Sequence, residues 1–136
     1  AAFHIPSNYS STVDGFLAVA ATYSTTGGLT NYSNYSATYV QISAPGSETA
    51  SRGLFAPVQG SNPNTSYTRA HGTSFASPIV AGAGALAIGI LKSRGASYTA
   101  ADIENYVKNA SDVNSHLQGL IQGCRALNLQ KLAESL

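Results

Sequence analysis

The stretch from His71 to Leu91 reads HGTSFASPIVAGAGALAIGIL and places one serine, Ser74, between a Gly-Thr turn and a long apolar run. Residues 79–91 carry no polar side chain. A helix that is apolar on all sides must be buried on all sides, so this run predicts a central buried helix. The run is short and rich in small residues, with Pro78 in its first turns, which disfavours a membrane span.

Strands are expected on the N-terminal side of this helix. Residues 16–23, GFLAVAAT, form a short apolar run after a polar turn and fit a buried strand. In the segment TYVQISAPG, which starts at Thr38, Tyr39 and Gln41 alternate with Val40 and Ile42 until Pro45 and Gly46 end the pattern. This alternation predicts a second strand. Residues 46–66 predict a loop with at most one hairpin, and residues 66–70 predict a short strand that leads into the helix.

Two further helices are expected after the central one. Residues 99–111 have an amphipathic pattern, and Thr99 with Asp102 makes a capping box at their start. Asn128 is positioned to cap a last helix over residues 129–136. Strands, a buried helix and peripheral helices describe an α/β layered fold. Two or three strands cannot cover an apolar helix on every side, so residues 1–136 are interpreted as part of a larger domain.

Composition narrows the class of protein. Charged residues make up only 10% of the chain, and the net charge is +1 with no basic cluster, which argues against nucleic acid and anionic membranes as partners. Ser, Thr, Asn and Tyr supply the polar surface instead, as is typical of a secreted or extracellular hydrolase, including a periplasmic one. The single cysteine, Cys124, excludes an internal disulfide framework.

The residues around Ser74 allow two interpretations. A serine hydroxyl is a poor nucleophile until a base, usually an oriented histidine, activates it. The start of a helix exposes the oxygen and offers unpaired N–H groups to an oxyanion, while Gly72 permits a sharp turn and the close approach of a substrate. The alternative is that Ser74 only caps the helix. These features alone do not choose between the two.

The sequence GTSFASPIVAGAGAL resembles the nucleophile signature of the subtilases, the subtilisin-like serine proteases. The matching residues are Gly72, Thr73, Ser74, Ala76, Pro78, Val80, Ala81 and Gly82. Three other segments resemble the family in the expected order: IPSNY with GFLAVAAT, YSNYSATYVQISAPG, and GCRALNLQKLAE. The resemblance implies the C-terminal part of a three-layer sandwich with a mainly parallel sheet and a central buried helix. It also implies a serine endopeptidase.

Carried over residue by residue, the resemblance makes Ser74 the acylated nucleophile, and its backbone N–H half of the oxyanion hole. The Thr73 hydroxyl would assist, and the turn at His71 and Gly72 would border the leaving-group side of the cleft. His4 would line the primary specificity pocket. The chain departs from the family pattern at His71, where Asn is common, at Ile79, where His is common, and at Arg125, where Gly is customary.

The remaining catalytic groups of the family are not among residues 1–136. In subtilases the Asp, the His and the oxyanion Asn precede the serine, and here the matching sequence begins after them. His71 is too close to Ser74 along the chain to act as its base, and His116 reads as a surface residue in a polar turn. We therefore expect the chain alone to be inactive. Its expected partners are the N-terminal chain of the same protease, or otherwise a second copy, and a protein or peptide substrate.

Two further expectations concern a bound metal and a competing function. No acidic run suggests a metal centre; subtilases often bind calcium, and residues 7–16 could offer carbonyl oxygens to a weak calcium site. The competing function is a non-catalytic fragment or complementation module, which would bind a partner through its exposed core face.

Overall fold

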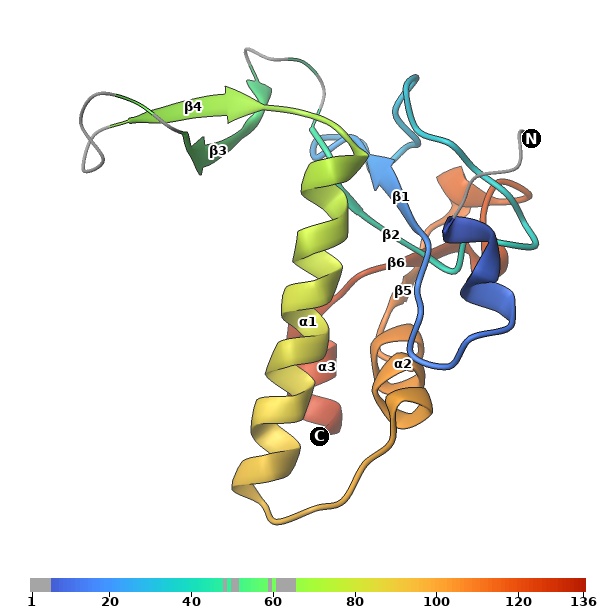
Figure 1. Cartoon of the computed structure of the whole chain (residues 1–136). Coiled ribbons are helices and arrows are strands. Elements are labelled where there is room, and N and C mark those ends of the chain that lie inside the picture. The colour runs from blue at the N-terminus through green and yellow to red at the C-terminus, as the bar shows by residue number, and fades with distance from the viewer. Residues whose placement is uncertain (1–5, 48, 50–51, 59, 61–65) are drawn as a thin grey trace.

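The computed structural model describes the chain except for residues 1–5, 48, 50–51, 59 and 61–65. The architecture is mixed α/β, as the sequence predicts, with one long helix against a small sheet (Figure 1). The sheet has the strand order β1-β2-β6-β5. Its strands are β1 (Val19–Thr22), β2 (Ile42–Pro45), β5 (Asp112–Val113) and β6 (Arg125–Ala126). The pairs β1–β2 and β2–β6 are parallel, and only β5 is antiparallel to its neighbour.

The strand predicted over residues 16–23 is confirmed as β1, but the second strand starts later than its sequence pattern suggests. The Ser36 hydroxyl oxygen accepts hydrogen bonds from the backbone N–H groups of Thr38 and Tyr39, both at 3.2 Å. These bonds hold the start of the segment in a turn, so that β2 begins only at Ile42.

A separate two-stranded sheet joins β2 to the long helix. It consists of β3 (Leu54–Pro57) and β4 (Tyr67–Ala70), which pair antiparallel as a hairpin. In Figure 1 this hairpin projects from the N-terminal end of α1 (Thr73–Ser93) to the side opposite β1. The predicted short strand before the helix is therefore confirmed, and the loop before it contributes the hairpin partner.

The helix α1 has one buried face. The residues of that face follow helical spacing and are Ala76, Val80, Ala83, Ala87 and Leu91. They pack on β1 and β2 and against α2 (Ala100–Asn109) and α3 (Leu129–Ser135). The other face is not covered within this chain: Leu86 is 41% exposed, and a Cβ added at Gly82 or Gly89 would meet nothing within 4 Å. Burial on every side is thus not achieved by the described residues.

By length and composition α1 is also the one helix among the described residues that could cross a membrane. The core helix of a globular protein satisfies the same criteria. Its contacts with the sheet and with both other helices are those of a core helix.

The two C-terminal helices begin at the predicted caps. The Thr99 side chain accepts from the N–H of Asp102, and the Asp102 carboxylate accepts from the N–H of Thr99, which confirms the capping box of α2. The Asn128 side chain accepts from the N–H of Lys131 at the start of α3.

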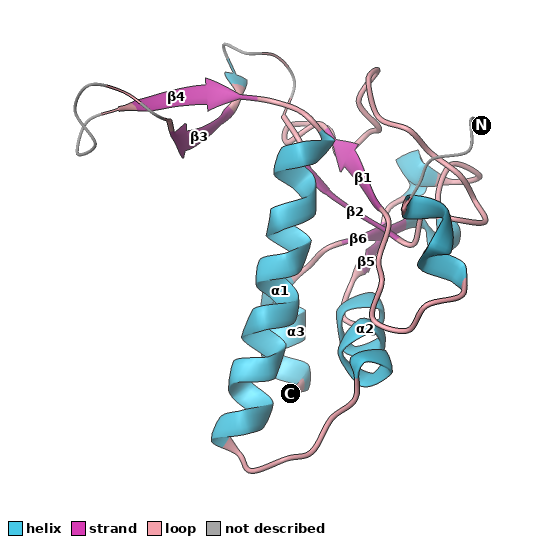
Figure 2. Ribbon diagram, viewed as in Figure 1, coloured by secondary structure: helices cyan, strands magenta, loops and turns pink. Residues whose placement is uncertain are grey.

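The sheet separates two apolar clusters, so the chain forms three layers (Figure 2). On the helical side, Ile42 and Ala44 pack against α1, with Leu132 from α3. On the other side, Ala20 and Leu117 form a smaller cluster. The three short 3-10 helices are η1 (Ser7–Ser11), η3 (Ser115–Leu117) and η4 (Gln122–Cys124). Two of them contribute to this cluster: η3 supplies Leu117 and η4 supplies Cys124. Full burial of a large aliphatic side chain such as Ile42, Leu117 or Leu132 contributes about 1.5–3 kcal/mol to the free energy of unfolding.

Candidate active site

Ser74 is the second residue of α1 and is exposed. The N-cap of the helix is Gly72, with φ 143° and ψ 165°, a backbone conformation that L side chains rarely adopt. The cap interpretation of Ser74 is therefore wrong, because the glycine two residues earlier occupies the cap position. The backbone N–H groups of Phe75 and Ala76 both point to the Gly72 carbonyl, at 3.0 and 3.4 Å. The first N–H groups of a helix have no acceptor within it, so the N–H of Ser74 is directed outward.

The turn before Ser74 is held from β2. The N–H of Gly72 donates to the Gly46 carbonyl at 2.9 Å, and the Tyr32 hydroxyl contacts the carbonyl oxygens of Gly46 and Ser47 at 2.7 and 2.6 Å. The His71 ring packs against the Tyr32 ring, with centroids 5.4 Å apart and a tilt of 58°. His71 is thus held at the side of this turn by its contact with Tyr32.

A cavity of about 360 Å³ opens beside Ser74. On the helix side, Thr73, Ser74 and Ser77 line it. The opposite wall consists of Pro6 and Ser7 at η1 and residues 16–19 at the start of β1. The structure therefore brings together Gly72, Thr73, Ser74 and His71 from the sequence-predicted set, whereas His4 lies outside the described residues.

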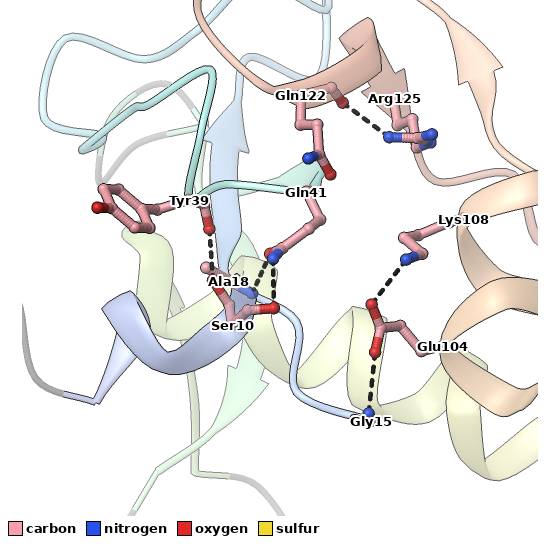
Figure 3. Close-up of polar contacts among 9 residues, drawn as sticks. All are labelled: Ser10, Gly15, Ala18, Tyr39, Gln41, Glu104, Lys108, Gln122 and Arg125. Atoms are coloured by element: carbon pink, nitrogen blue, oxygen red, sulfur yellow. Dashed lines mark hydrogen bonds and ion pairs between the residues drawn. The ribbon is translucent and has the colours of Figure 1, made fainter. Parts of the chain in front are cut away.

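A buried amide holds the far wall of this cavity in place (Figure 3). Gln41 is only 3% exposed, and its side-chain oxygen accepts from the N–H of Ala18 at 2.9 Å. Its amide nitrogen donates to the Ser10 carbonyl at 2.7 Å, while the Ser10 hydroxyl donates to the Tyr39 carbonyl at 2.6 Å. Gln41 thereby ties η1 to the β1–β2 pair, which fixes Ser7 opposite Ser74. The sequence pattern shows Gln41 only as a polar residue in a strand and does not reveal this role.

A second hollow continues from the first along α1. This groove of about 500 Å³ runs between α1, α2 and residues 15–19, and its lining is mostly apolar. Glu104 lies at its edge, accepting from the N–H of Gly15 at 2.9 Å and from Lys108 at 2.7 Å (Figure 3). The ion pair is largely shielded, with Lys108 and Glu104 side chains 19% and 12% exposed.

The outer edge of β1 borders the same hollows. The N–H of Ala21 donates to the Ser33 hydroxyl and its carbonyl accepts from the N–H of Thr30, so Ala21 is bonded on this edge. Alternate residues of a strand direct their backbone groups to the same edge, which gives Val19 the same direction. Across the described part of the chain, Val19 has no hydrogen-bond partner on that edge.

Metal ligands do not gather in the described part of the chain: no group of three or more His, Cys, Asp or Glu side chains could hold an ion there. The calcium site suggested for residues 7–16 stays a prediction. The carboxylates with shifted pKa values lie away from Ser74. Hydrogen bonds from Thr99 lower the pKa of Asp102 at the start of α2, and hydrogen bonds from Lys131 and Asn128 lower the pKa of Asp112 in β5.

Comparison with protein-family models identifies the class. The Peptidase_S8 model, described as the subtilase family, matches residues 1–126. The chain belongs to the subtilase family, a family of serine proteases. A comparison with curated proteins gave no match.

Solved structures agree with this assignment. The structure described as the basis of subtilase cytotoxin SubAB assembly aligns with a TM-score of 0.70 at 21% identity, over 96% of this chain and 41% of that one. The self-cleaved protease domain of PatA aligns with a TM-score of 0.70 at 25% identity, over 95% and 43%. The prenylagaramide maturation protease PagA aligns with a TM-score of 0.63 at 28% identity, over 98% and 45%. The fold is therefore that of subtilisin-like proteases, and the chain spans less than half the length of these structures.

Proposed function

We propose that this chain supplies the nucleophile of a subtilisin-like serine endopeptidase, and that the nucleophile is Ser74. The observation that carries the proposal is the exposed position of Ser74 at the start of a core helix, beside a cavity, in a chain of the subtilase family. A residue in this position has its hydroxyl open to substrate and a helix N-terminus behind it.

In the proposed reaction the Ser74 Oγ attacks the scissile carbonyl carbon while a histidine base removes its proton. The carbonyl π bond opens to an oxyanion, to which the N–H of Ser74 donates. The oxyanion re-forms the carbonyl, the C–N bond breaks, and the amine leaves with the proton from the histidine. Water then hydrolyses the acyl ester by the same sequence and restores Ser74. The Thr73 hydroxyl would support the oxyanion side, and His4 and His71 would contact substrate.

The histidine base and its aspartate would come from outside these residues. Of the histidines in the described part of the chain, His71 packs on Tyr32 and His116 lies exposed in η3. Neither forms a hydrogen bond with Ser74 among the described contacts. We propose that an N-terminal part of the same protease supplies the base, the orienting acid and the oxyanion Asn.

Three features support such a partner. The apolar groove along α1 is open, the outer face of α1 exposes Leu86, and the edge of β1 is unpaired at Val19. Open strand edges and apolar grooves favour association, since burial contributes about 25 cal/mol per Å² before the costs of association. Without the N-terminal part, the same surfaces would favour a homo-oligomer. The proposed setting is secreted, with a protein or peptide as substrate.

The same open surfaces also fit the second candidate, a non-catalytic module that binds a partner through its core face. Fluorophosphonate labelling separates the two, because the reagent reacts with an activated serine. The protein is labelled as isolated from its source, the adduct is mapped by mass spectrometry, and partners are identified by light scattering of the same fraction. An adduct on Ser74 in a fraction that contains a second chain supports the protease, with Ser93 at the far end of α1 as the internal control. A partner complex with no adduct would instead support the binding module.

A further inference from the structure

The β3–β4 hairpin carries an exposed aromatic surface next to the candidate active site. The strand register places Phe55 opposite Arg69 and Pro57 opposite Tyr67, so these four residues share one face of the hairpin. All four are exposed, with Phe55 66% and Tyr67 49% open to solvent. We refer to these four residues as the aromatic face.

The side chains of the aromatic face are organised with respect to one another. The rings of Phe55 and Tyr67 stack with centroids 5.2 Å apart and an interplanar angle of 15°. The Arg69 guanidinium carbon lies 5.9 Å from the Phe55 ring centroid, and its Nη1 donates to the Gly53 carbonyl at 3.1 Å. The stacking orders the surface without burying it. It presents two aromatic rings, a proline and a positive charge to solvent.

The base of the hairpin is fixed to the turn that carries Ser74. A Cβ on Gly53 would lie 2.5 Å from both the N and O atoms of Ala70, so the two strands are in close backbone contact there. Below this point, the Gly72–Gly46 hydrogen bond closes the loop onto β2. The strands that carry the aromatic face therefore meet at a base that leads directly into the turn before Ser74.

The position of the aromatic face relative to Ser74 indicates which part of a bound polypeptide would reach it. Tyr67 precedes Ser74 by seven positions, so the two lie at most roughly 24 Å apart even with an extended chain. The cavity beside Ser74 is on the β1 side of the helix start, whereas the hairpin projects to the opposite side (Figure 1). A polypeptide whose acyl side occupies the cavity would leave Ser74 in the direction of the hairpin.

We infer that the aromatic face binds the substrate polypeptide on the leaving-group side of the scissile bond, and that it selects an aromatic or large apolar residue next to an acidic one. This inference rests on the proposed function of Ser74. Stacked rings and proline offer contact to an apolar side chain, and aromatic and arginine residues are over-represented where binding energy concentrates. The Arg69 charge favours a carboxylate beside it.

Peptide binding tests the inference without requiring catalysis. The protein used is the Ser74→Ala variant, which cannot cleave the peptide through Ser74. Fluorescence anisotropy measures the Kd of a labelled peptide that is long enough to span the cavity and the hairpin and carries Phe-Glu in its leaving-group part. A matched peptide carries Ala-Gln at those positions. We expect the double variant Phe55→Ala/Tyr67→Ala to bind the Phe-Glu peptide about tenfold more weakly. Tyr35→Ala, which removes another exposed tyrosine (53%), should bind it unchanged.

A second variant, Arg69→Gln, distinguishes the loss of one binding contact from a general loss of folding. Arg69→Gln should weaken binding of the Phe-Glu peptide but not of a Phe-Gln peptide, because only the former has the carboxylate. The inference is overturned if the Phe-Glu and Ala-Gln peptides bind equally, or if Arg69→Gln affects both glutamate and glutamine peptides alike. It is also overturned if light scattering shows that the double variant dissociates a dimer of this chain, because the face would then bind a second copy. Absence of the Ser74 adduct with peptide discrimination intact would count against the proposed nucleophile alone.

Discussion

Gly72 and Gly46 are joined by a hydrogen bond of 2.9 Å from the N–H of Gly72 to the carbonyl oxygen of Gly46. Gly46 follows β2, and Gly72 is the N-cap of α1, so this bond connects the end of a core strand to the turn before Ser74. The Tyr32 hydroxyl contacts the same carbonyl. The position of the candidate nucleophile therefore depends on β2 as well as on its own helix.

Replacing Gly46 with alanine should loosen this connection. A Cβ there would lie 2.5 Å from the Cβ of Ala21 and 3.0 Å from the Gly72 carbonyl oxygen. Overpacking of this kind costs about 1–3 kcal/mol, so we expect the free energy of unfolding to fall by that amount in urea titrations. Gly89→Ala is the control, since its Cβ would meet nothing within 4 Å and alanine favours helix. Equal stability of Gly46→Ala and the unmodified chain would show that the turn adjusts freely.

Replacing Gln41 with leucine should destabilise the wall opposite Ser74. The change leaves the buried N–H of Ala18 and carbonyl of Ser10 without their partner, at a cost of about 1–3 kcal/mol for each unsatisfied group. Hydrogen exchange at Ala18 should accelerate by more than at Ala83, within α1. The control is Gln118→Leu, at an exposed position. Unchanged exchange at Ala18 would contradict the role assigned to Gln41.

Acid should weaken the junction between β5 and α3. Hydrogen bonds from Lys131 at 2.5 Å and Asn128 at 2.9 Å lower the pKa of Asp112. A carboxyl group with a lowered pKa in the folded state stabilises the fold above its unfolded pKa of about 4, and that contribution disappears as the pH falls through the folded value. We therefore expect Asp112→Asn to lower the unfolding temperature at pH 7, with a difference from the unmodified chain that shrinks below about pH 4.

The matched control for this charge removal is Asp14→Asn, in an exposed turn. High salt should reduce the Asp112 effect only in part, because the Asn128 hydrogen bond is not an ion pair. A pH-independent difference between Asp112→Asn and the unmodified chain would rule out the carboxylate as the cause.

Much of the fold follows from the sequence because local signals and burial agree. The apolar run of residues 79–91 gives α1, and the caps at Thr99 and Asn128 give the starts of α2 and α3. The strands β5 and β6 each have two residues, which is too short for any periodicity to appear. They exist because β6 pairs with Ser43 in β2, a contact between residues far apart in the sequence.

Only part of the candidate active site could be predicted from the sequence. Gly72, Thr73 and Ser74 lie in one motif, and their geometry depends on neighbours along the chain. Tyr32, Gln41 and the stacked pair Phe55 and Tyr67 act through contacts that folding creates, so no local pattern marks them. The exposed face of α1 is a similar case. Its apolar residues predict that another segment packs on them, and the described residues include no such segment.

The proposal that Ser74 is the nucleophile, and that another part of the protease supplies its base, is tested by peptide hydrolysis. Hydrolysis by the chain alone is compared with hydrolysis by the chain combined with the N-terminal part of the same protease. The catalytic groups of a serine protease act as a unit, and loss of one costs up to roughly a millionfold in kcat. We expect no enzymatic rate for the chain alone. We expect activity in the combination, abolished by Ser74→Ala and retained in Ser93→Ala. Ser74-dependent hydrolysis by a preparation free of any second chain, or activity of the combination that survives Ser74→Ala, would contradict the proposal.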